Sequence, residues 1–207
     1  SGSKINPKDP KSPTYTPDQA TVTEDHTLTV HYVGAPNNPA DKQQHSHWTR
    51  EVTIDKVTGK TLSSTDWATK DSYVPVDTPK IDGYTPDKNV VDEQTVRENR
   101  VIQVTYTANS ARALVRFIDN TENRTLDELE SKGKTGETID FAKANAQLKS
   151  YLDRGYNLVA NGNEIPTTET KFDTSDDTHV ASQVYEVHLK HGTVTVTPEN
   201  PVDSGSK

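Results

Sequence analysis

The sequence predicts an α+β fold that is rich in β-strand and divided into two successive domains. A chain of 207 residues is long for one small domain and comfortable for two, because single domains most often run to about 100–150 residues. Each half opens and closes with a short segment in which apolar and polar residues alternate, as in a strand with one buried face. Only 29% of the residues are hydrophobic, so each domain is expected to bury a small core.

Four alternating segments mark the ends of the two domains. They are 27–33 and 101–106 in the first domain, and 113–118 and 184–189 in the second. A proline at every third or fourth position from Pro7 to Pro17 favours an extended spacer before them. We therefore expect a linker over 1–24, domains over 25–108 and 111–192, and a second linker over 193–207.

The second domain contains the strongest helix signal in the chain. Apolar residues spaced by three and four share one helix face, namely Phe141, Ala144, Leu148 and Leu152. Asp140 can cap the N-terminus, and Gly155 stands where a left-handed residue often ends a helix. With a strand expected at 135–139 before the helix, the order strand, strand, helix, strand, strand is that of the ubiquitin-like β-grasp fold.

The first domain is predicted to be denser in strand. Trp48, Arg50, Val52 and Ile54 occupy alternate positions, and a glycine-containing turn at 56–60 leads into a further strand. Pro75 and Pro79 prevent a long helix after residue 68. A helix is therefore only weakly indicated in this domain.

Charge and composition argue against several classes of partner. The 31 acidic and 23 basic residues give a formal net charge of −8, which repels nucleic acid backbones and anionic lipids. No apolar run approaches the roughly 20 residues that span a bilayer. Cys and Met are both absent, which removes disulfides and thiol chemistry and favours an exported protein.

The sequence offers no pattern for catalysis or for a cofactor. It lacks a Cys nucleophile, a Gly-x-Ser-x-Gly turn, a phosphate-binding loop and a His-Glu-x-x-His motif. Isolated carboxylate pairs are expected by chance in a chain with 31 acidic residues. We therefore predict a protein that is not an enzyme and uses no cofactor.

Five segments of the chain carry recognisable motifs: 55–60 and 79–87 in the first domain, and 117–121, 133–139 and 187–192 in the second. Through these motifs the chain resembles the Mub or MucBP repeats of surface proteins from lactic acid bacteria. The first domain resembles the B2-type module, and the second resembles the B1-type module. The B1-type module usually has Thr-Thr-Gly after its first Asp, where this chain continues from Asp119 to Asn120 and Thr121. The shape of that turn is therefore left open.

The resemblance implies two tandem β-grasp domains in an elongated arrangement, belonging to an extracellular adhesin whose cell-wall anchor lies outside this segment. It further implies binding of host mucin glycoproteins or their glycans and, in some repeats, of immunoglobulins, with avidity supplied by repetition. Neighbouring repeats of the same chain are the other expected contacts. The alternative is a structural stalk that only holds other repeats away from the cell.

Four residues of the first domain are candidates for ligand binding: Trp67, Tyr73, His45 and His47. Exposed aromatic rings contact sugars and protein partners, and core packing is the alternative for each ring. Trp67, in a polar loop, is the strongest surface candidate. His45 and His47 share one face of a strand, but no third metal ligand is evident, so solvated strand residues are favoured and no metal site is predicted.

The second domain holds two further groups of interest. His188 and His191, at the end of the last strand, are expected to serve the structure. Residues 173–177 contain three carboxylates, which suit calcium, but they lack the glycine and distal glutamate of a helix-loop-helix calcium site. A solvated turn is therefore favoured there. The sequence alone also does not identify which lysine and asparagine would join in an internal isopeptide bond.

Overall fold

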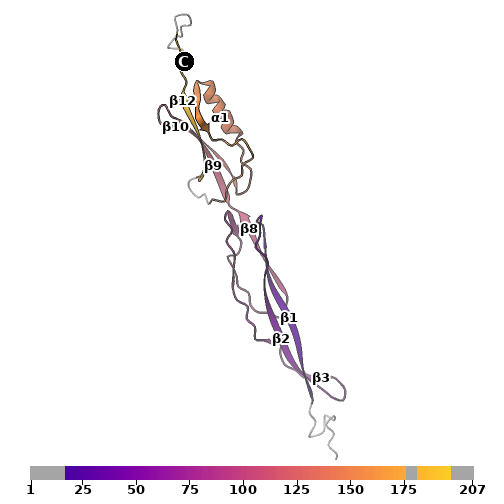
Figure 1. Ribbon diagram of the computed structural model, residues 1–207. Helices are drawn as coiled ribbons and strands as arrows, with labels where there is room; N and C mark the ends of the chain where they lie inside the picture. Colours follow the sequence, from indigo (N-terminus) through magenta and orange to yellow (C-terminus); the bar gives the residue numbers. More distant parts are fainter. Residues whose placement is uncertain (1–16, 176–180, 197–207) are drawn as a thin grey trace, which may run out of the picture. The chain divides into compact units, whose positions relative to one another are not determined.

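The computed structural model describes residues 17–175 and 181–196, which pack into two compact units (Figure 1). Unit 1 takes the described residues up to Pro79 together with Pro86–Thr107. Unit 2 takes Lys80–Thr85 together with the described residues from Ala108 onward. Most of the two expected linkers, at 1–16 and 197–207, lies outside the described residues.

Unit 1 is built on a long hairpin and a parallel strand. β1 (Asp18–Val33) pairs antiparallel with β2 (Lys42–Ile54) and parallel with β8 (Arg100–Ala108), so the opening and closing strands of the unit are neighbours. The other strands are short, namely β3 (Thr61–Ser64), β4 (Ala68–Thr69), β5 (Val76–Asp77) and β7 (Val90–Val91). Of β6 (Tyr84–Pro86), only Pro86 belongs to this unit. β3 and β4 pair with β2, while β5 pairs with β7.

Residues 18–24 belong to β1, which corrects the linker boundary expected at residue 24. The pairing with β2 starts at Asp18 opposite Ile54 and continues without interruption. Pro17 is the last proline of the spacer, and the Thr-Val-Thr run that follows it suits a strand. The alternation of apolar residues does not reveal this half of β1, because none of its residues before Leu28 is fully buried.

The core of unit 1 lies on one face of the β1–β2–β8 sheet. Leu28, Val30 and Tyr32, the alternating residues of the predicted opening strand, are each at most 2% exposed. Val104 and Tyr106 join them from β8. The described part of unit 1 contains no helix, so short strands and irregular chain supply the remaining buried residues, among them Tyr73 and Val91.

Unit 2 has the predicted order of strand, strand, helix, strand, strand. The elements are β9 (Ser110–Asp119), β10 (Arg124–Lys134), α1 (Ala142–Asp153), β11 (Tyr156–Asn163) and β12 (Gln183–His191). The sheet order is β10-β9-β12-β11, and β9 and β12 are parallel. Phe117, Val187 and Leu189 are fully buried at the centre of a core that α1 completes with Ala144 and Leu148.

The second strand of unit 2 is not where the sequence placed it. The expected strand at 135–139 is absent apart from one isolated bridge at Thr138, and the strand is β10 instead. Gly136 has a φ of +84°, which bends the chain and prevents a strand there. β10 was missed because most of its residues are polar, so its sequence shows little alternation.

The predicted helix is confirmed, with two differences at its ends. Leu152 is 40% exposed, and Tyr151 takes its expected place in the core. Asp140 lies one residue before the cap position, yet its carboxylate accepts a hydrogen bond from the amide of Ala142 at 2.9 Å. Gly155 ends the helix with a φ of +106°, as predicted. No helix among the described residues has the length and apolar character needed to cross a membrane.

Candidate functional site

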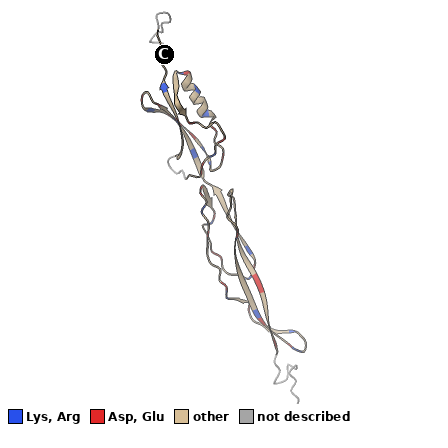
Figure 2. Ribbon diagram, in the orientation of Figure 1, with Lys and Arg blue, Asp and Glu red and all other residues tan. Residues whose placement is uncertain are grey.

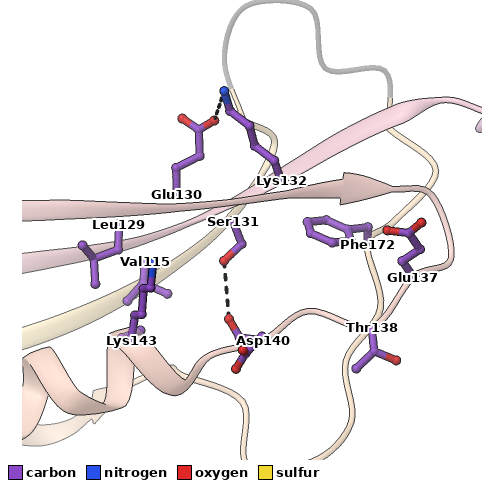
Figure 3. A pocket seen from close by; sticks show the side chains of 11 residues that line it. Val115, Leu129, Glu130, Ser131, Lys132, Glu137, Thr138, Asp140, Lys143 and Phe172 are labelled. Atoms are coloured by element: carbon purple, nitrogen blue, oxygen red, sulfur yellow. Dashed lines mark hydrogen bonds and ion pairs between the residues drawn. The ribbon is translucent and has the colours of Figure 1, made fainter.

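Unit 2 has a groove of about 450 Å³ between β10 and the start of α1 (Figure 3). Four consecutive residues of β10, Leu129 to Lys132, line one side of it. The remaining lining residues come from β9, from the chain between β10 and α1, from α1 itself and from one position before β12, namely Val115, Glu137, Thr138, Asp140, Lys143, Ala144 and Phe172. Consecutive strand residues point to opposite faces, so the groove lies along the outer edge of β10.

The main chain of β10 contributes polar groups to this edge. No strand among the described residues pairs with the outer side of β10. The amide of Lys134 donates to the Glu137 carboxylate at 3.1 Å, and the amide of Glu128 donates to the Asp127 carboxylate at 2.8 Å. The period of a strand directs the amides and carbonyls of Glu130 and Lys132 to the same side, where they are available to a ligand.

The side chains of the groove combine both signs of charge with a small apolar base. Glu130 forms ion pairs with Arg112 and Lys132 at 3.3 and 3.5 Å, whereas Lys143 forms no ion pair with any described residue. Phe172 is only 4% exposed, so its ring offers no face for stacking. The groove is therefore suited to hydrogen bonding and ionic contact.

Asp119 and His191 form a buried connection at the other end of unit 2. The His191 ring nitrogen Nε2 lies 2.6 Å from Oδ2 of Asp119, and the other carboxylate oxygen accepts the amides of Thr121 and Glu122 at 2.9 and 3.2 Å. Burial raises the pKa of Asp119, but these hydrogen bonds, led by that from His191, outweigh it and hold the pKa below its ordinary value. The turn after β9 is thereby fixed to the end of β12.

The second predicted histidine, His188, also bonds within unit 2. Its Nδ1 lies 2.9 Å from Oδ1 of Asn120, and its Nε2 lies 3.4 Å from the Glu186 carboxylate. Asp119, Glu122 and His191 lie close enough to share a metal ion, but each already has a partner within the protein. These contacts are consistent with the structural role expected of both histidines.

Trp67, the strongest surface candidate, is half-buried and lies against two arginines. The guanidinium carbons of Arg50 and Arg97 lie 5.1 and 4.7 Å from the centre of its ring system. Such cation–π contacts are worth about 0.5–2 kcal/mol, depending on how far the cation is desolvated. The ring therefore has less free surface than an exposed loop tryptophan offers a sugar.

Tyr73 belongs to the interior of unit 1. It is 8% exposed, and its hydroxyl lies 2.8 Å from the hydroxyl of Ser46, which is itself 1% exposed. Trp48 donates its indole N–H to the same Ser46 oxygen at 2.8 Å. A ring held in this chain of bonds has little surface left for a ligand, so core packing accounts for Tyr73.

His45 and His47 point to the exposed face of β2, as their spacing predicted. His45 lies 3.0 Å from the hydroxyl of Thr27, and His47 lies 2.5 Å from the carboxylate of Asp25. Each histidine thus bonds with the residue directly opposite it on β1. The two are not brought together with Trp67 or Tyr73 by any contact among the described residues.

The acidic residues at 173–177 lie partly outside the described residues. The carboxylate of Asp173 accepts the amide and hydroxyl of Ser175, while residues 176 and 177 are among those not described.

Figure 2 shows acidic and basic positions in both units. Sequence reasoning did not select the groove, because Ser131 and Lys143 look like ordinary surface residues until β10 and α1 are placed side by side.

Two family models match successive parts of the chain. Residues 17–110 match the Muc B2-like domain, and residues 111–191 match the mucin binding domain. The class of protein is therefore that of tandem, strand-rich adhesin repeats. The chain belongs to the Mub/MucBP family, with a Muc B2-like domain followed by a MucBP domain.

Several solved structures are similar to part of this chain. The mucin-binding domain of Spr1345 from Streptococcus pneumoniae is 28% identical, with 44% of this chain and 97% of that chain covered and a TM-score of 0.38. The MucBP domain of the adhesion protein from Pediococcus pentosaceus is 33% identical, with coverages of 42% and 99% and a TM-score of 0.37. The type 2 repeat of the mucus binding protein MUB from Lactobacillus reuteri is 28% identical, with coverages of 44% and 59% and a TM-score of 0.33. A search of curated proteins finds no match to the chain.

Proposed function

We propose that this chain is a repeat of a bacterial surface adhesin that binds mucin glycoproteins, and that the groove of unit 2 receives part of the ligand. The family to which residues 111–191 belong is described as a mucin binding domain, which supports the choice of ligand. The observation that carries the proposal is the groove itself. An edge of β10 and a lysine line it, and neither has a strand or ion-pair partner among the described residues; several carboxylates line the same hollow.

The groove fits the chemistry of a glycoprotein. Sugar hydroxyls and peptide groups both donate and accept hydrogen bonds. The main-chain groups of Glu130 and Lys132 can serve either, Asp140 supplies acceptors, and Lys143 supplies donors. A single groove of this kind is expected to bind weakly, and repetition of such units along a longer, wall-anchored protein would supply avidity. Recognition in this proposal proceeds by binding, without a chemical step.

The proposal extends to the fold of the two units. The sheet order of unit 2, with α1 inserted after the first hairpin and its first and last strands parallel, supports a β-grasp fold for this unit. Unit 1 has the same central hairpin and parallel closing strand, so we place it in the same class with irregular chain in place of the helix.

Surface plasmon resonance with the 207-residue protein tests the function. Purified mucin, immunoglobulin G and serum albumin are immobilised on parallel surfaces, and saturable binding to mucin above the albumin background is expected. Saturable binding to immunoglobulin would add the second partner implied by the resemblance. Absence of saturable binding to mucin would favour the stalk alternative and reject the proposal.

Two charge-reversed variants of α1 test the groove. Lys143→Glu is expected to weaken mucin binding about 5- to 10-fold, the loss of one charge-assisted hydrogen bond. Lys149→Glu makes the same change on the same helix, at a residue that pairs with Asp153 outside the groove. It is expected to leave binding within about twofold. Equal losses in both variants would indicate an effect of net charge and would remove the groove from the proposal.

A further inference from the structure

The sheet face that forms the core of unit 1 becomes charged toward the start of β1. Glu24 lies opposite Trp48 in the pairing of β1 with β2, and Val22 lies opposite Arg50. Because side chains alternate along a strand, these residues share the face of Leu28 and Val30. The core face therefore continues into a polar region that carries Glu24 and Arg50.

Trp67 is held at this end of the sheet by its own segment of chain. Thr65 donates its amide to the carbonyl of Glu51 and accepts the amide of Glu51 on its hydroxyl, both at 2.9 Å. The Trp67 ring is thereby brought next to Arg50 of β2 and Arg97 of the chain before β8. Since the two guanidinium carbons lie 5.1 and 4.7 Å from one ring centre, they are at most about 10 Å apart.

The two arginines differ in how their charge is compensated. Arg97 donates through Nη1 to both carboxylate oxygens of Glu24, at 3.0 and 2.9 Å. Arg50 forms no ion pair and no hydrogen bond with any described residue, and its Nε is buried without a partner. Its one assigned contact is with the Trp67 ring.

Arg50 is unusual among the arginines of this acidic chain. Carboxylates pair with five of the seven, namely Arg97, Arg100, Arg112, Arg116 and Arg124. Arg154 has no carboxylate partner in the described part of the chain, but it donates Nε to the carbonyl of Ser150 and lies over Tyr151. A half-buried guanidinium with no acceptor costs about 1–3 kcal/mol for its unsatisfied donor, and a second cation near the same ring adds repulsion.

We propose that Arg50 and Arg97 form a binding site for an oxyanion, a carboxylate or a sulfate ester, carried on an acidic sugar of the ligand. The nature of this carrier rests on the proposed function, whereas the anion site rests on the arginines alone. A guanidinium presents five donors in a planar fork that matches such groups. Arg50 has the four donors of its two Nη atoms without a partner among the described residues, while its Nε is buried, and Arg97 retains Nε and Nη2 after pairing with Glu24.

This site changes the role expected of Trp67. The ring contacts both guanidinium groups and is not itself the surface on which a sugar stacks. Glu24 neutralises one of the two cations, so the site keeps a net positive charge of about one and can accept a monoanion. In a chain of net charge −8, such a site is selective because most other surfaces repel an anion.

NMR titration of the whole protein tests the site with three small probes: glucuronate, galactose 6-sulfate and neutral galactose, at constant ionic strength. The two anions are expected to shift the Arg50 Nε–H and Trp67 indole N–H signals, and galactose is expected to leave both unchanged. Arg50→Gln should weaken anion binding at least tenfold. Arg154→Gln is the matched control, since Arg154 also lies over an aromatic ring without a carboxylate partner, and it should bind like the native protein.

The outcomes separate this inference from the proposed function. Anion binding within twofold of native in Arg50→Gln, or equal shifts with galactose, would overturn the site whether or not the chain binds mucin. Loss of anion binding in Arg50→Gln but not in Arg154→Gln supports the site, even if immobilised mucin is not bound. The melting temperature of Arg50→Gln should stay within about 2 °C of native, because the variant also removes an unsatisfied donor. A large drop would show that Arg50 is retained for stability and would count against the inference.

Discussion

The two units share one arrangement of strands and differ in what completes the core. In each, a hairpin is joined by a closing strand parallel to its first strand: β1, β2 and β8 in unit 1, and β9, β10 and β12 in unit 2. α1 covers the sheet of unit 2, while unit 1 uses short strands and irregular chain. The strand arrangement alone therefore does not determine how the apolar face is buried.

The choice of cover changes the kind of interaction that holds each unit together. α1 contributes Leu148 and Tyr151 to an apolar core around Phe117. Irregular chain has main-chain polar groups that need partners, and unit 1 supplies them from side chains. Gln44, for example, both donates to the carbonyl and accepts from the amide of Val74, at 2.9 and 2.8 Å. We expect unit 1 to depend more on hydrogen bonds and unit 2 more on packing.

The two units can be unfolded separately in one sample. Both tryptophans, Trp48 and Trp67, belong to unit 1, and the described helix belongs to unit 2. Tryptophan fluorescence therefore follows unit 1, and the helical circular dichroism signal follows unit 2. Each prediction below names the unit whose transition should move.

The largest effect is expected from Asp119→Ala. This change removes a fully buried carboxylate that bonds to His191 and to two amides, and it leaves those donors without an acceptor. We expect a loss of about 3–5 kcal/mol from unit 2, read from urea denaturation followed by circular dichroism. Asp119→Asn keeps an oxygen for the amides and should lose less. A fluorescence transition that shifts as much as the helical one would contradict a role confined to unit 2.

Acid should affect unit 2 through the same carboxylate. The folded pKa of Asp119 lies below its ordinary value of about 3.9, so its contribution is fully present above that pH and is lost as the pH falls through the folded pKa. Unit 2 should therefore hold constant stability near neutrality and weaken below about pH 4. Glu24 of unit 1 also has a lowered pKa, chiefly from its bond with His26, but it is only half-buried and should contribute less. In Asp119→Asn, unit 2 should lose less stability as the pH falls below about 4. An unchanged loss of stability would assign the acid effect to other groups.

The sequence predicted the strands and the helix in which apolar residues recur at a regular spacing. It missed the features that form only where distant segments of the chain meet. Alternation identified β1, β8, β9 and β12, and the spacing of Ala144 and Leu148 identified α1, because burial on one face leaves a period in the sequence. β10 shows no such period of apolar residues, because an edge strand buries little of its surface. The groove follows from β10, so it could not be predicted either.

The candidate residues of unit 1 show the same limit. Tyr73 and Trp67 are both aromatic residues in polar, irregular segments, and no local pattern separates them. Tyr73 is buried because Ser46 offers it a partner across the sheet, while Trp67 stays half-buried between arginines from two distant segments. Tyr73 and Ser46 are 27 positions apart, and Trp67 lies 17 and 30 positions from Arg50 and Arg97. Such pairings are not visible in one sequence.

A smaller effect is expected from Tyr73→Phe in unit 1. The variant keeps the ring in the core and removes only its bond to Ser46, whose hydroxyl still accepts the Trp48 indole N–H. We expect a loss of about 1 kcal/mol, seen in the fluorescence transition. Tyr151→Phe provides the comparison in unit 2, where the ring packs against Phe117 and its hydroxyl has no assigned partner. A larger loss in Tyr151→Phe than in Tyr73→Phe would reverse the distinction between hydrogen bonding and packing.

The smallest effect concerns a turn that both units share. Asp55 directly follows β2 and Asp119 ends β9, and each accepts the amides two and three residues ahead. The residue four positions ahead has a positive φ in both turns. That residue is Gly59 at +74° in unit 1 and Asn123 at +53° in unit 2. Asparagine tolerates this conformation better than other non-glycine residues, which explains how unit 2 keeps the turn without a glycine at this position.

Exchanging these two residue types should therefore shift the units in opposite directions. Asn123→Gly should stabilise unit 2 by about 0.5 kcal/mol, because relief at positive φ exceeds the added freedom of the unfolded chain by only a little. Gly59→Ala should destabilise unit 1 by about 1 kcal/mol, and since an added Cβ there meets nothing within 4 Å, the cost is that of the backbone alone. Thermal melts followed by tryptophan fluorescence for unit 1 and by circular dichroism for unit 2 measure the two changes in stability. If Asn123→Gly lowers the helical transition, the Asn123 side chain does more than tolerate the turn, and the two turns are not equivalent.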